Sequence, residues 1–243
     1  MRYLITFSYN GNYFSGYQRQ KNLKTVQGSL EEYLSILNNS PVSIHSSGRT
    51  DVGVHAINAK AHFDLDKDIK EYNIKTFLNR NLNGKIYIKK VEKVKDNFHA
   101  RYNVLKKEYH YFINLGEFNP IEKDYVYQYC KPLNIRLMKK ASKVFLKEHD
   151  FRAFCSNEKE KKNCIRTIYN IRIIRKKEKL ELIFIGNGFL KHMVRNIVGI
   201  LVKVGSNSIN ISDVKKILDS KERKHNTKPV PGNGLYLWEV YYK

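Results

Sequence analysis

Residues 168–185, IYNIRIIRKKEKLELIFI, contain two apolar runs separated by a short polar segment. The runs Ile168–Arg175 and Leu180–Ile185 are each typical of a strand in length and composition. A connection as short as residues 176–179 joins antiparallel neighbours, because parallel strands need a much longer crossover. The stretch therefore predicts an antiparallel sheet, and with it an α+β fold class rather than a doubly wound one.

The other predicted elements extend outward from this hairpin. Residues 2–9 alternate with a period of two, which predicts a strand, and residues 10–16 form a turn-rich loop. Further strands are expected at Ile86–Val94, Glu108–Asn114, Tyr125–Cys130 and Leu235–Tyr242. Helices are expected after the capping residue Thr25, around residues 74–82, at Leu137–Phe145, at the largely apolar Phe189–Val204, and after a cap at Ser212.

A soft boundary near residue 105 divides the chain into two expected lobes. The N-terminal lobe is residues 1–104 and the C-terminal lobe is residues 105–243. No low-complexity linker marks the boundary. We therefore expect the lobes to share one central, mostly antiparallel mixed sheet flanked by helices.

The charge of the chain is its strongest compositional feature. There are 45 Lys and Arg against 23 Asp and Glu, which gives a formal net charge of +22. A globular protein this basic is expected to bind a polyanion, with nucleic acid as the first candidate and an anionic membrane surface as the second. A lysine-rich proteome also explains part of the excess, and composition does not separate RNA from DNA. No apolar run is long enough for a transmembrane helix, and we expect no signal peptide.

The cysteines and histidines exclude several common site types. The three cysteines are odd in number and form no C-x-x-C pair, so a disulfide framework is not expected and a cytoplasmic location fits. The histidines show no metalloprotease or zinc-finger spacing, so we expect no metal site. A phosphate-binding G-x-x-x-x-G-K-[ST] loop is also absent from the sequence, which argues against a P-loop nucleotide enzyme.

The segment SGRTDVGVHA, residues 47–56, carries the candidate chemistry. Gly48 and Gly53 bracket an Arg-Thr-Asp core and allow a sharply shaped loop. The cation at Arg49 favours an ionised carboxylate at Asp51, and a positioned carboxylate can act as a nucleophile or a base. Taken alone, this is weak evidence for a catalytic site, because Arg-Thr-Asp-x-Gly is better explained as ordinary turn chemistry.

Together with other motifs, this segment resembles the catalytic motif of TruA-type tRNA pseudouridine synthases. The similar stretches run in order along nearly the whole chain: Tyr9–Gln20, Thr25–Glu31, Gly48–Ala56, Phe98–Arg101, Lys107–Tyr111, Asp150–Phe154, Phe189–Gly199 and Pro231–Leu237. The chain departs from the family pattern at Arg152-Ala153, at Asn83 and at Lys228–Pro231. These departures leave Asp51, Tyr109 and Arg195 untouched.

The resemblance implies the pseudouridine synthase fold and a cofactor-free isomerase. Members of this family convert uridine to pseudouridine in the anticodon arm of tRNA, typically at positions 38, 39 and 40, and work as homodimers. By resemblance, Asp51 is the catalytic nucleophile. It either attacks C1′ of the ribose or assists removal of the 2′ proton, and the sequence leaves both routes open.

Other residues receive roles by the same resemblance. Tyr109 is expected to pack on the target base, and Arg195 to pair with the catalytic aspartate. Arg49 is expected to contact phosphate or to fill the vacated base stack. Further possible RNA contacts are Gln18, Arg19, Arg101 and the basic runs Lys159–Lys162 and Lys221–His225. His55 is expected to support the loop by hydrogen bonding.

Two other classes of function compete with this interpretation. A non-catalytic RNA-binding protein on the same fold would need the charge but not Asp51. A nuclease or another base-modifying enzyme would need clustered acidic ligands or a nucleotide-binding glycine loop, and the sequence shows neither.

Overall fold

The computed structural model describes residues 1–156, 163–223 and 228–242. The run Lys159–Lys162 and the last two residues of the run Lys221–His225 lie outside the described residues. The chain divides into two compact units. Unit 1 comprises Met1–Leu105 and the segment from Tyr236 onward, whereas unit 2 comprises Lys106–Leu235.

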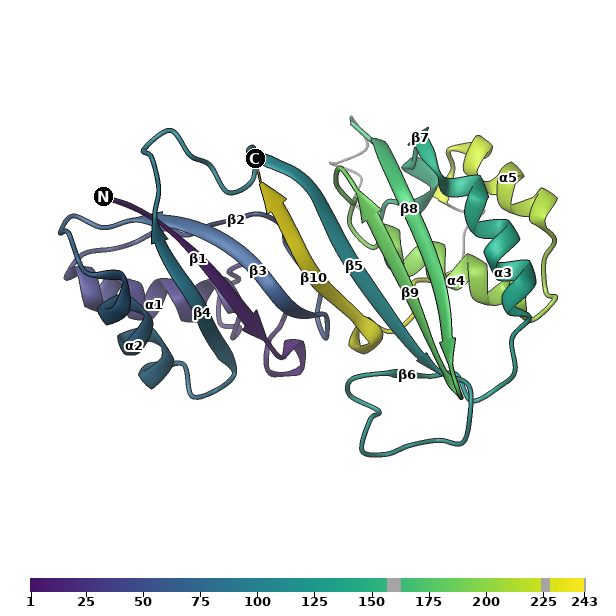
Figure 1. Cartoon of the computed structure of the whole chain (residues 1–243), viewed down its shortest axis with the longest axis horizontal. Coiled ribbons are helices and arrows are strands. Elements are labelled where there is room, and N and C mark those ends of the chain that lie inside the picture. The colour runs from purple at the N-terminus through teal and green to yellow at the C-terminus, as the bar shows by residue number, and fades with distance from the viewer. Residues whose placement is uncertain (157–162, 224–227, 243) are drawn as a thin grey trace. The chain divides into compact units, whose positions relative to one another are not determined.

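Unit 1 is a helix-covered sheet with the strand order β4-β1-β3-β10, and β2 pairs with β3 (Figure 1). All of these pairings are antiparallel except β3 with β10, which is parallel. The strands are β1 Arg2–Tyr9, β2 His45–Ser46, β3 His55–Asp64, β4 Ile86–Lys93 and β10 Leu235–Tyr242. The helices are α1 Val26–Asn38 and α2 Glu71–Asn81.

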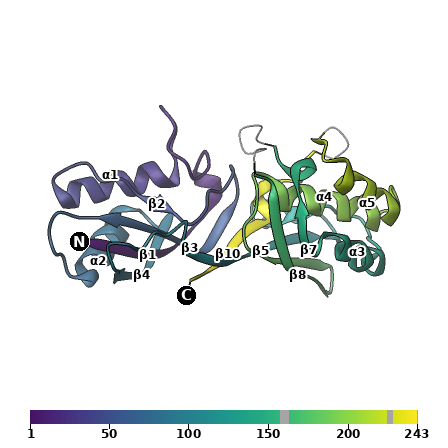
Figure 2. The same ribbon diagram turned by 90° about the horizontal axis from the view of Figure 1, so that it is seen from above.

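Helix α1 forms where the sequence predicts it and lies along one face of this sheet (Figure 2). The side chain of Thr25 accepts a hydrogen bond from the Gly28 N–H and caps the first turn. Leu30 and Leu34 are fully buried, because residues four apart share one face of a helix.

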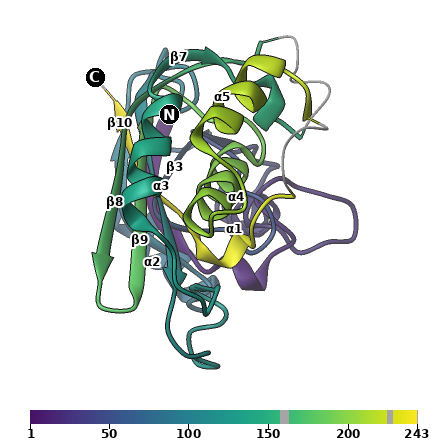
Figure 3. The same ribbon diagram turned by 90° about the vertical axis from the view of Figure 1, so that its right-hand side faces the viewer.

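Unit 2 has the strand order β5-β9-β8-β7, with β6 parallel to β5 and the other pairs antiparallel. Helices α3, α4 and α5 lie on one side of β8 and β9 (Figure 3). The strands are β5 Val104–Asn114, β6 Tyr127–Gln128, β7 Lys147–Asp150, β8 Ile165–Lys176 and β9 Lys179–Gly186. The helices are α3 Ile135–Ser142, α4 Met193–Gly205 and α5 Ile211–Ser220.

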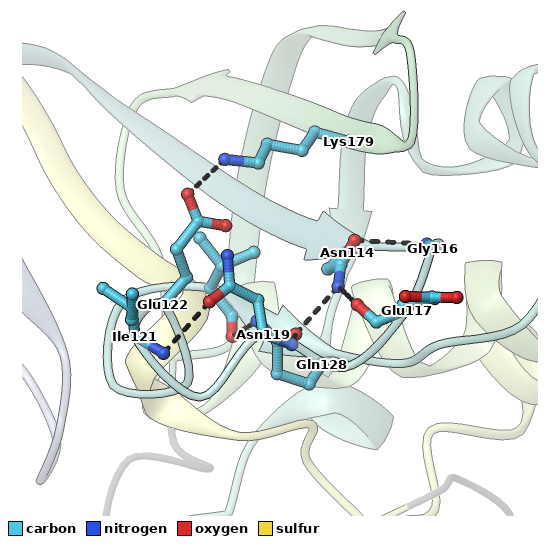
Figure 4. A network of polar contacts seen from close by, with 9 residues as sticks. Asn114, Gly116, Glu117, Asn119, Ile121, Glu122, Gln128 and Lys179 are labelled. Carbon is cyan, nitrogen blue, oxygen red and sulfur yellow. Dashed lines mark hydrogen bonds and ion pairs between the residues drawn. The ribbon is translucent and has the colours of Figure 1, made fainter.

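The end of β5 is braced by a network of polar contacts in the loop that follows it (Figure 4). Asn114 is buried, and its side-chain amide donates to the Glu117 carbonyl at 2.6 Å and to Gln128 Oε1 at 2.8 Å. Its Oδ1 accepts from the Gly116 N–H at 3.1 Å. Lys179, at the start of β9, forms an ion pair with Glu122 of the loop. These contacts fix the C-terminal end of the strand that carries Tyr109.

The structure confirms an α+β fold with mixed, mostly antiparallel pairing and flanking helices, including the β8–β9 hairpin. Several predicted boundaries were wrong. The cap of α5 is Asn210, which forms a capping box with Asp213, and not Ser212. The strand expected at Tyr125–Cys130 is only Tyr127–Gln128. None of the helices in the described part of the chain is long and apolar enough to cross a membrane.

Candidate active site

Two loops meet at one end of the unit 1 sheet. Tyr9, at the end of β1, lies opposite Ala56 of β3 and Ile86 of β4. The chain leaves β1 into residues 10–17 and enters β3 from residues 47–54, so both segments lie at this end of the sheet. The motif Tyr9–Gln20 therefore lies beside the segment that contains Asp51.

Asp51 begins a tight turn at the exposed tip of its loop. The Val54 N–H donates to the Asp51 carbonyl oxygen at 3.2 Å. Gly53 has a φ of +76°, a conformation that glycine adopts without steric cost. Asp51 is half-buried, and the next side chain, Val52, is 65% exposed. The turn thus holds the carboxylate at a surface that solvent reaches.

The residue before Asp51 is fixed by the first loop. The Tyr17 N–H donates to the Thr50 carbonyl at 3.0 Å, and the hydroxyls of Tyr9 and Thr50 are hydrogen-bonded at 2.8 Å. Tyr9 and Tyr17 are both buried. Thr50 is therefore held through its backbone and its side chain.

The C-terminal side of the turn is held by His55. Its ring is only 2% exposed and stacks on Tyr236 of β10, with ring centroids 4.7 Å apart. Nδ1 accepts a hydrogen bond from the Gly11 N–H at 3.1 Å. An accepting Nδ1 carries no proton, so the imidazole is neutral with its hydrogen on Nε2. His55 acts here as a support of the loop, in agreement with the sequence interpretation.

Two glycines allow the close approach of these segments. A Cβ atom added at Gly11 would lie 2.2 Å from the Val54 carbonyl oxygen, far inside van der Waals contact. Gly16 has a φ of +89°, and a Cβ there would lie 3.2 Å from the Thr50 carbonyl. The motif therefore requires glycine at both positions for steric reasons.

Arg19 is part of a polar network at the start of α1. Gln27 Oε1 accepts from the Arg19 N–H at 3.0 Å, and Gln27 Nε2 donates to Glu31 Oε1 at 2.9 Å. Arg19 Nη1 lies 3.2 Å from Oε2 of the buried Glu31 carboxylate. The Arg19 side chain is nevertheless 70% exposed, so most of it stays open to solvent while one nitrogen contacts Glu31. Gln18, beside it, is also exposed.

The Phe98–Arg101 motif packs against β3 and β10. The Ala100 N–H donates to Nδ1 of His62 at 3.1 Å, and the Tyr242 hydroxyl donates to the Ala100 carbonyl at 2.7 Å. Arg101 itself is exposed and donates its backbone N–H to His99. Arg49 is also exposed. The backbone of this motif thus links β3 to β10 through hydrogen bonds, and Arg101 lies at the surface.

His62 gives unit 1 a predicted sensitivity to acid. Burial, reinforced by His99, His45 and Arg2, lowers the pKa of His62 to about 4, while Asp64 opposes the shift. Because the unfolded chain has the higher pKa, of about 6.5, it binds the proton first as the pH falls. We expect the free energy of unfolding to be unaffected by this group above pH 6.5 and to decrease toward pH 4.

Urea denaturation across this range measures the effect, with His62→Asn as the control. The amide oxygen of asparagine can still accept the Ala100 N–H but does not titrate. An equal loss of stability in both proteins would show that His62 does not carry it.

Tyr109 lies on β5 in unit 2. It pairs with Phe184 of β9, and its side chain is 7% exposed. Its ring meets Phe189 edge to face, with centroids 5.2 Å apart. Phe189 comes from the segment before α4, so two family-like motifs of unit 2 are in direct contact.

Arg195 is a half-buried residue on the largely apolar helix α4. Its Nε donates to the Val230 carbonyl at 2.7 Å. Its charge also acts on Tyr111, whose pKa burial raises well above the ordinary value while Arg195 lowers it. The Tyr111 hydroxyl donates to the Pro231 carbonyl at 2.8 Å. The Val230 carbonyl thus helps to orient Arg195, and the next carbonyl, of Pro231, holds Tyr111. Asp51 belongs to unit 1, and Tyr109 and Arg195 belong to unit 2.

Comparison with known proteins gives a family. A family model described as tRNA pseudouridine synthase matches residues 5–103 and 141–243. The chain is 42% identical over 243 residues to tRNA pseudouridine synthase A 1 of Bacillus cereus, covering 99% of this chain and 98% of the relative. It is 41% identical to tRNA pseudouridine synthase A of Malacoplasma penetrans, with full coverage of both chains. A relative from Limosilactobacillus reuteri is 40% identical, with 99% and 96% covered.

The chain belongs to the tRNA pseudouridine synthase family. It is therefore an isomerase that acts on tRNA, and the fold expected from the motifs is that of the family. Across the part of this pseudouridine synthase that the structure describes, no group of three or more His, Cys, Asp or Glu side chains could hold a metal ion.

Some supports of the synthase's aspartate loop were not predicted. The sequence placed Tyr9 and Gly11 in a family-like motif, but gave no sign that they touch Thr50 and His55. The pairing of β1 with β3 creates that contact, and β3 itself was not predicted. The two glycines of the motif were the available signal, because glycine has no Cβ atom and allows another backbone segment to approach closely.

Proposed function

We propose that this chain isomerises uridine to pseudouridine in the anticodon arm of tRNA, with Asp51 as the nucleophile and without a cofactor. The observation that carries the proposal is the fixation of the Asp51 turn on both sides. Three hydrogen bonds, two from the first loop and one from Tyr9 at the end of β1, hold Thr50 and His55, and Asp51 lies between these residues at the exposed tip. Such preorganisation is what a reacting group requires.

The reaction balances without a co-reactant. The bond between C1′ and N1 of uracil breaks, a bond between C1′ and C5 forms, C5 loses a proton and N1 gains one. Substrate and product are isomers, so no electrons are exchanged. The Asp51 carboxylate either attacks C1′, forming an ester that C5 of uracil then displaces, or removes the proton from C2′ and returns it when C5 attacks C1′. It or a neighbouring group takes the proton from C5.

The target base must leave the stack before Asp51 can reach the sugar. This costs a few kcal/mol, which stacking and ionic contacts offset. We propose that Tyr109 packs on the flipped base, that Arg195 pairs with the Asp51 carboxylate, and that Arg49 contacts phosphate or fills the gap in the stack. The edge-to-face contact with Phe189 supports the role of Tyr109, because it fixes the plane of the ring.

The proposal also includes the RNA substrate and the oligomeric state of the protein. The net charge of +22 suits a large RNA, and the exposed Gln18, Arg19 and Arg101 are proposed as further contacts. We place the modified uridines at the three anticodon-arm positions typical of the family. A cytoplasmic homodimer is part of the proposal, since two copies enlarge the basic surface offered to one tRNA.

The test is a direct assay of the purified protein. An unmodified tRNA transcript is incubated with it in EDTA and without any cofactor, and pseudouridine is mapped by carbodiimide labelling and primer extension. We expect stops in the anticodon arm only. Loss of activity in EDTA, restored by a metal, would contradict the cofactor-free proposal. Tight tRNA binding with no pseudouridine at any position would favour a non-catalytic RNA-binding protein.

A further inference from the structure

Two lysines converge on the loop that supports the Asp51 turn. Lys24 precedes the cap of α1, and its carbonyl accepts from the Ser15 N–H at 2.8 Å. Lys85 precedes β4, and its carbonyl accepts from the Asn10 N–H at 3.2 Å. Both backbones are therefore fixed to residues 10–17, the segment that also holds Thr50 and His55.

The side chains of these lysines face each other. The ammonium of Lys85 lies over the ring of Tyr13, 5.5 Å from its centroid, which fixes the direction of the charge. Direct contact with Lys85 is the largest cause that lowers the pKa of Lys24, followed by the repulsion between their charges. Glu32 is the acidic neighbour that opposes this effect. Two adjacent ammonium groups repel each other, and an anion bound between them would reduce this repulsion.

The start of α1 adds to the positive potential at this place. Lys24 lies just before a helix of 13 residues, whose dipole is positive at its N-terminus. The first turn of α1, all of which the structure describes, contains no acidic residue. The first helical N–H groups bond to loop residues, as in Val26 to Gly16 and Gln27 to Tyr17, so the anion would interact mainly with the lysines.

We propose that Lys24 and Lys85 form a binding site for a phosphate group of the tRNA backbone, beside Tyr13 and at the same end of the unit 1 sheet as Asp51. The inference rests on the proposed function, because it takes the tRNA strand at Asp51 as the source of the phosphate. The register supports the shared location, since Tyr9 lies opposite both Ala56 and Ile86. The site would hold the strand near the uridine that is modified.

The salt dependence of the reaction tests the site. We compare Lys24→Gln/Lys85→Gln with the wild type and measure KM for tRNA over a series of KCl concentrations. Each lost phosphate contact should reduce the slope of log KM against log salt by roughly one, so the double variant should lose about one to two. At low salt its KM should rise, with kcat unchanged.

A matched control is Lys67→Gln/Lys95→Gln. Both lysines are exposed and follow β3 and β4 at the opposite end of the sheet, near the pair Arg2–Asp64. The eight residues of β1 separate the two ends by about 24 Å, at about 3.4 Å per step. The control removes the same charge from unit 1, so a reduction of the slope equal to that in Lys24→Gln/Lys85→Gln would overturn the proposal.

The outcomes separate this inference from the proposed function. A wild-type protein that forms no pseudouridine contradicts the proposed function itself. An active wild type whose salt slope is unchanged in Lys24→Gln/Lys85→Gln contradicts only the phosphate site. Thermal unfolding of both double variants checks that they fold, which matters most for Lys85, because it is half-buried and packs on Tyr13.

Discussion

Replacement of Asp51 by asparagine is expected to abolish pseudouridine formation. The amide keeps the size of the side chain but is neither a nucleophile nor a base, and loss of a catalytic group in other enzymes costs more than about a thousandfold in kcat. The turn should survive, because its hydrogen bonds involve the backbone of Asp51 and the groups on Thr50 and His55. Single-turnover assays on a tRNA transcript measure the effect.

The control for this variant is Asp219→Asn, the same chemical change on the exposed face of α5. It should retain wild-type activity. We expect Asp51→Asn to unfold at the wild-type temperature and to bind tRNA at least as tightly, because a negative charge near the RNA is removed. Activity retained in Asp51→Asn would exclude Asp51 as the nucleophile.

Gly11→Ala is expected to have the second-largest effect. The added methyl group would lie 2.2 Å from the Val54 carbonyl, and backbone atoms cannot move aside without displacing the turn that begins at Asp51. Overpacking of this kind costs about 1–3 kcal/mol of stability. A shift of about 1 Å at a reacting group can cost on the order of a hundredfold in rate. We therefore expect a lower unfolding temperature and a much lower kcat.

The matched control is Gly188→Ala. A Cβ atom there meets only the flexible side chain of Arg166, at an ordinary contact distance of 3.6 Å. Its unfolding temperature should stay close to that of the wild type. If Gly11→Ala is as active as the wild type, the contact between the first loop and the turn does not position Asp51.

Elements with strong local signals were predictable from the sequence. The cap Thr25 and the apolar stripe of α1 gave that helix, and the polar turn between β8 and β9 gave the hairpin. Strand β3 was missed because its buried face carries the alanines 56, 59 and 61. Alanine has low strand propensity, and only the packing of a central strand selects it.

The boundaries that failed have local physical causes. Asn210 and Ser212 are both good capping residues two positions apart, and the reciprocal bonds with Asp213 select the first. The helix expected from Phe189 begins at Met193, because His192 adopts a left-handed conformation with a φ of +63°. Nothing in the local pattern signals that bend.

The candidate site was only partly predictable. The motif predicts Asp51 as the nucleophile, and the place of His55 in the same motif predicts its supporting role. The contacts of Tyr9 and Gly11 with that segment join residues about 40 positions apart, as in the |i−j| of 44 between Gly11 and His55. Such contacts depend on strand register, which a single sequence specifies weakly.

The discontinuity of unit 1 has a consequence for its synthesis on the ribosome. Strands β1, β3 and β4 emerge before any residue of unit 2, whereas β10 emerges after all of it. Until then His55 lacks the ring of Tyr236, and Lys60 lacks the Val240 carbonyl to which it donates at 2.8 Å. The contiguous unit 2 can fold as it is translated. The nascent chain therefore completes the support of its aspartate loop only after unit 2 has been made.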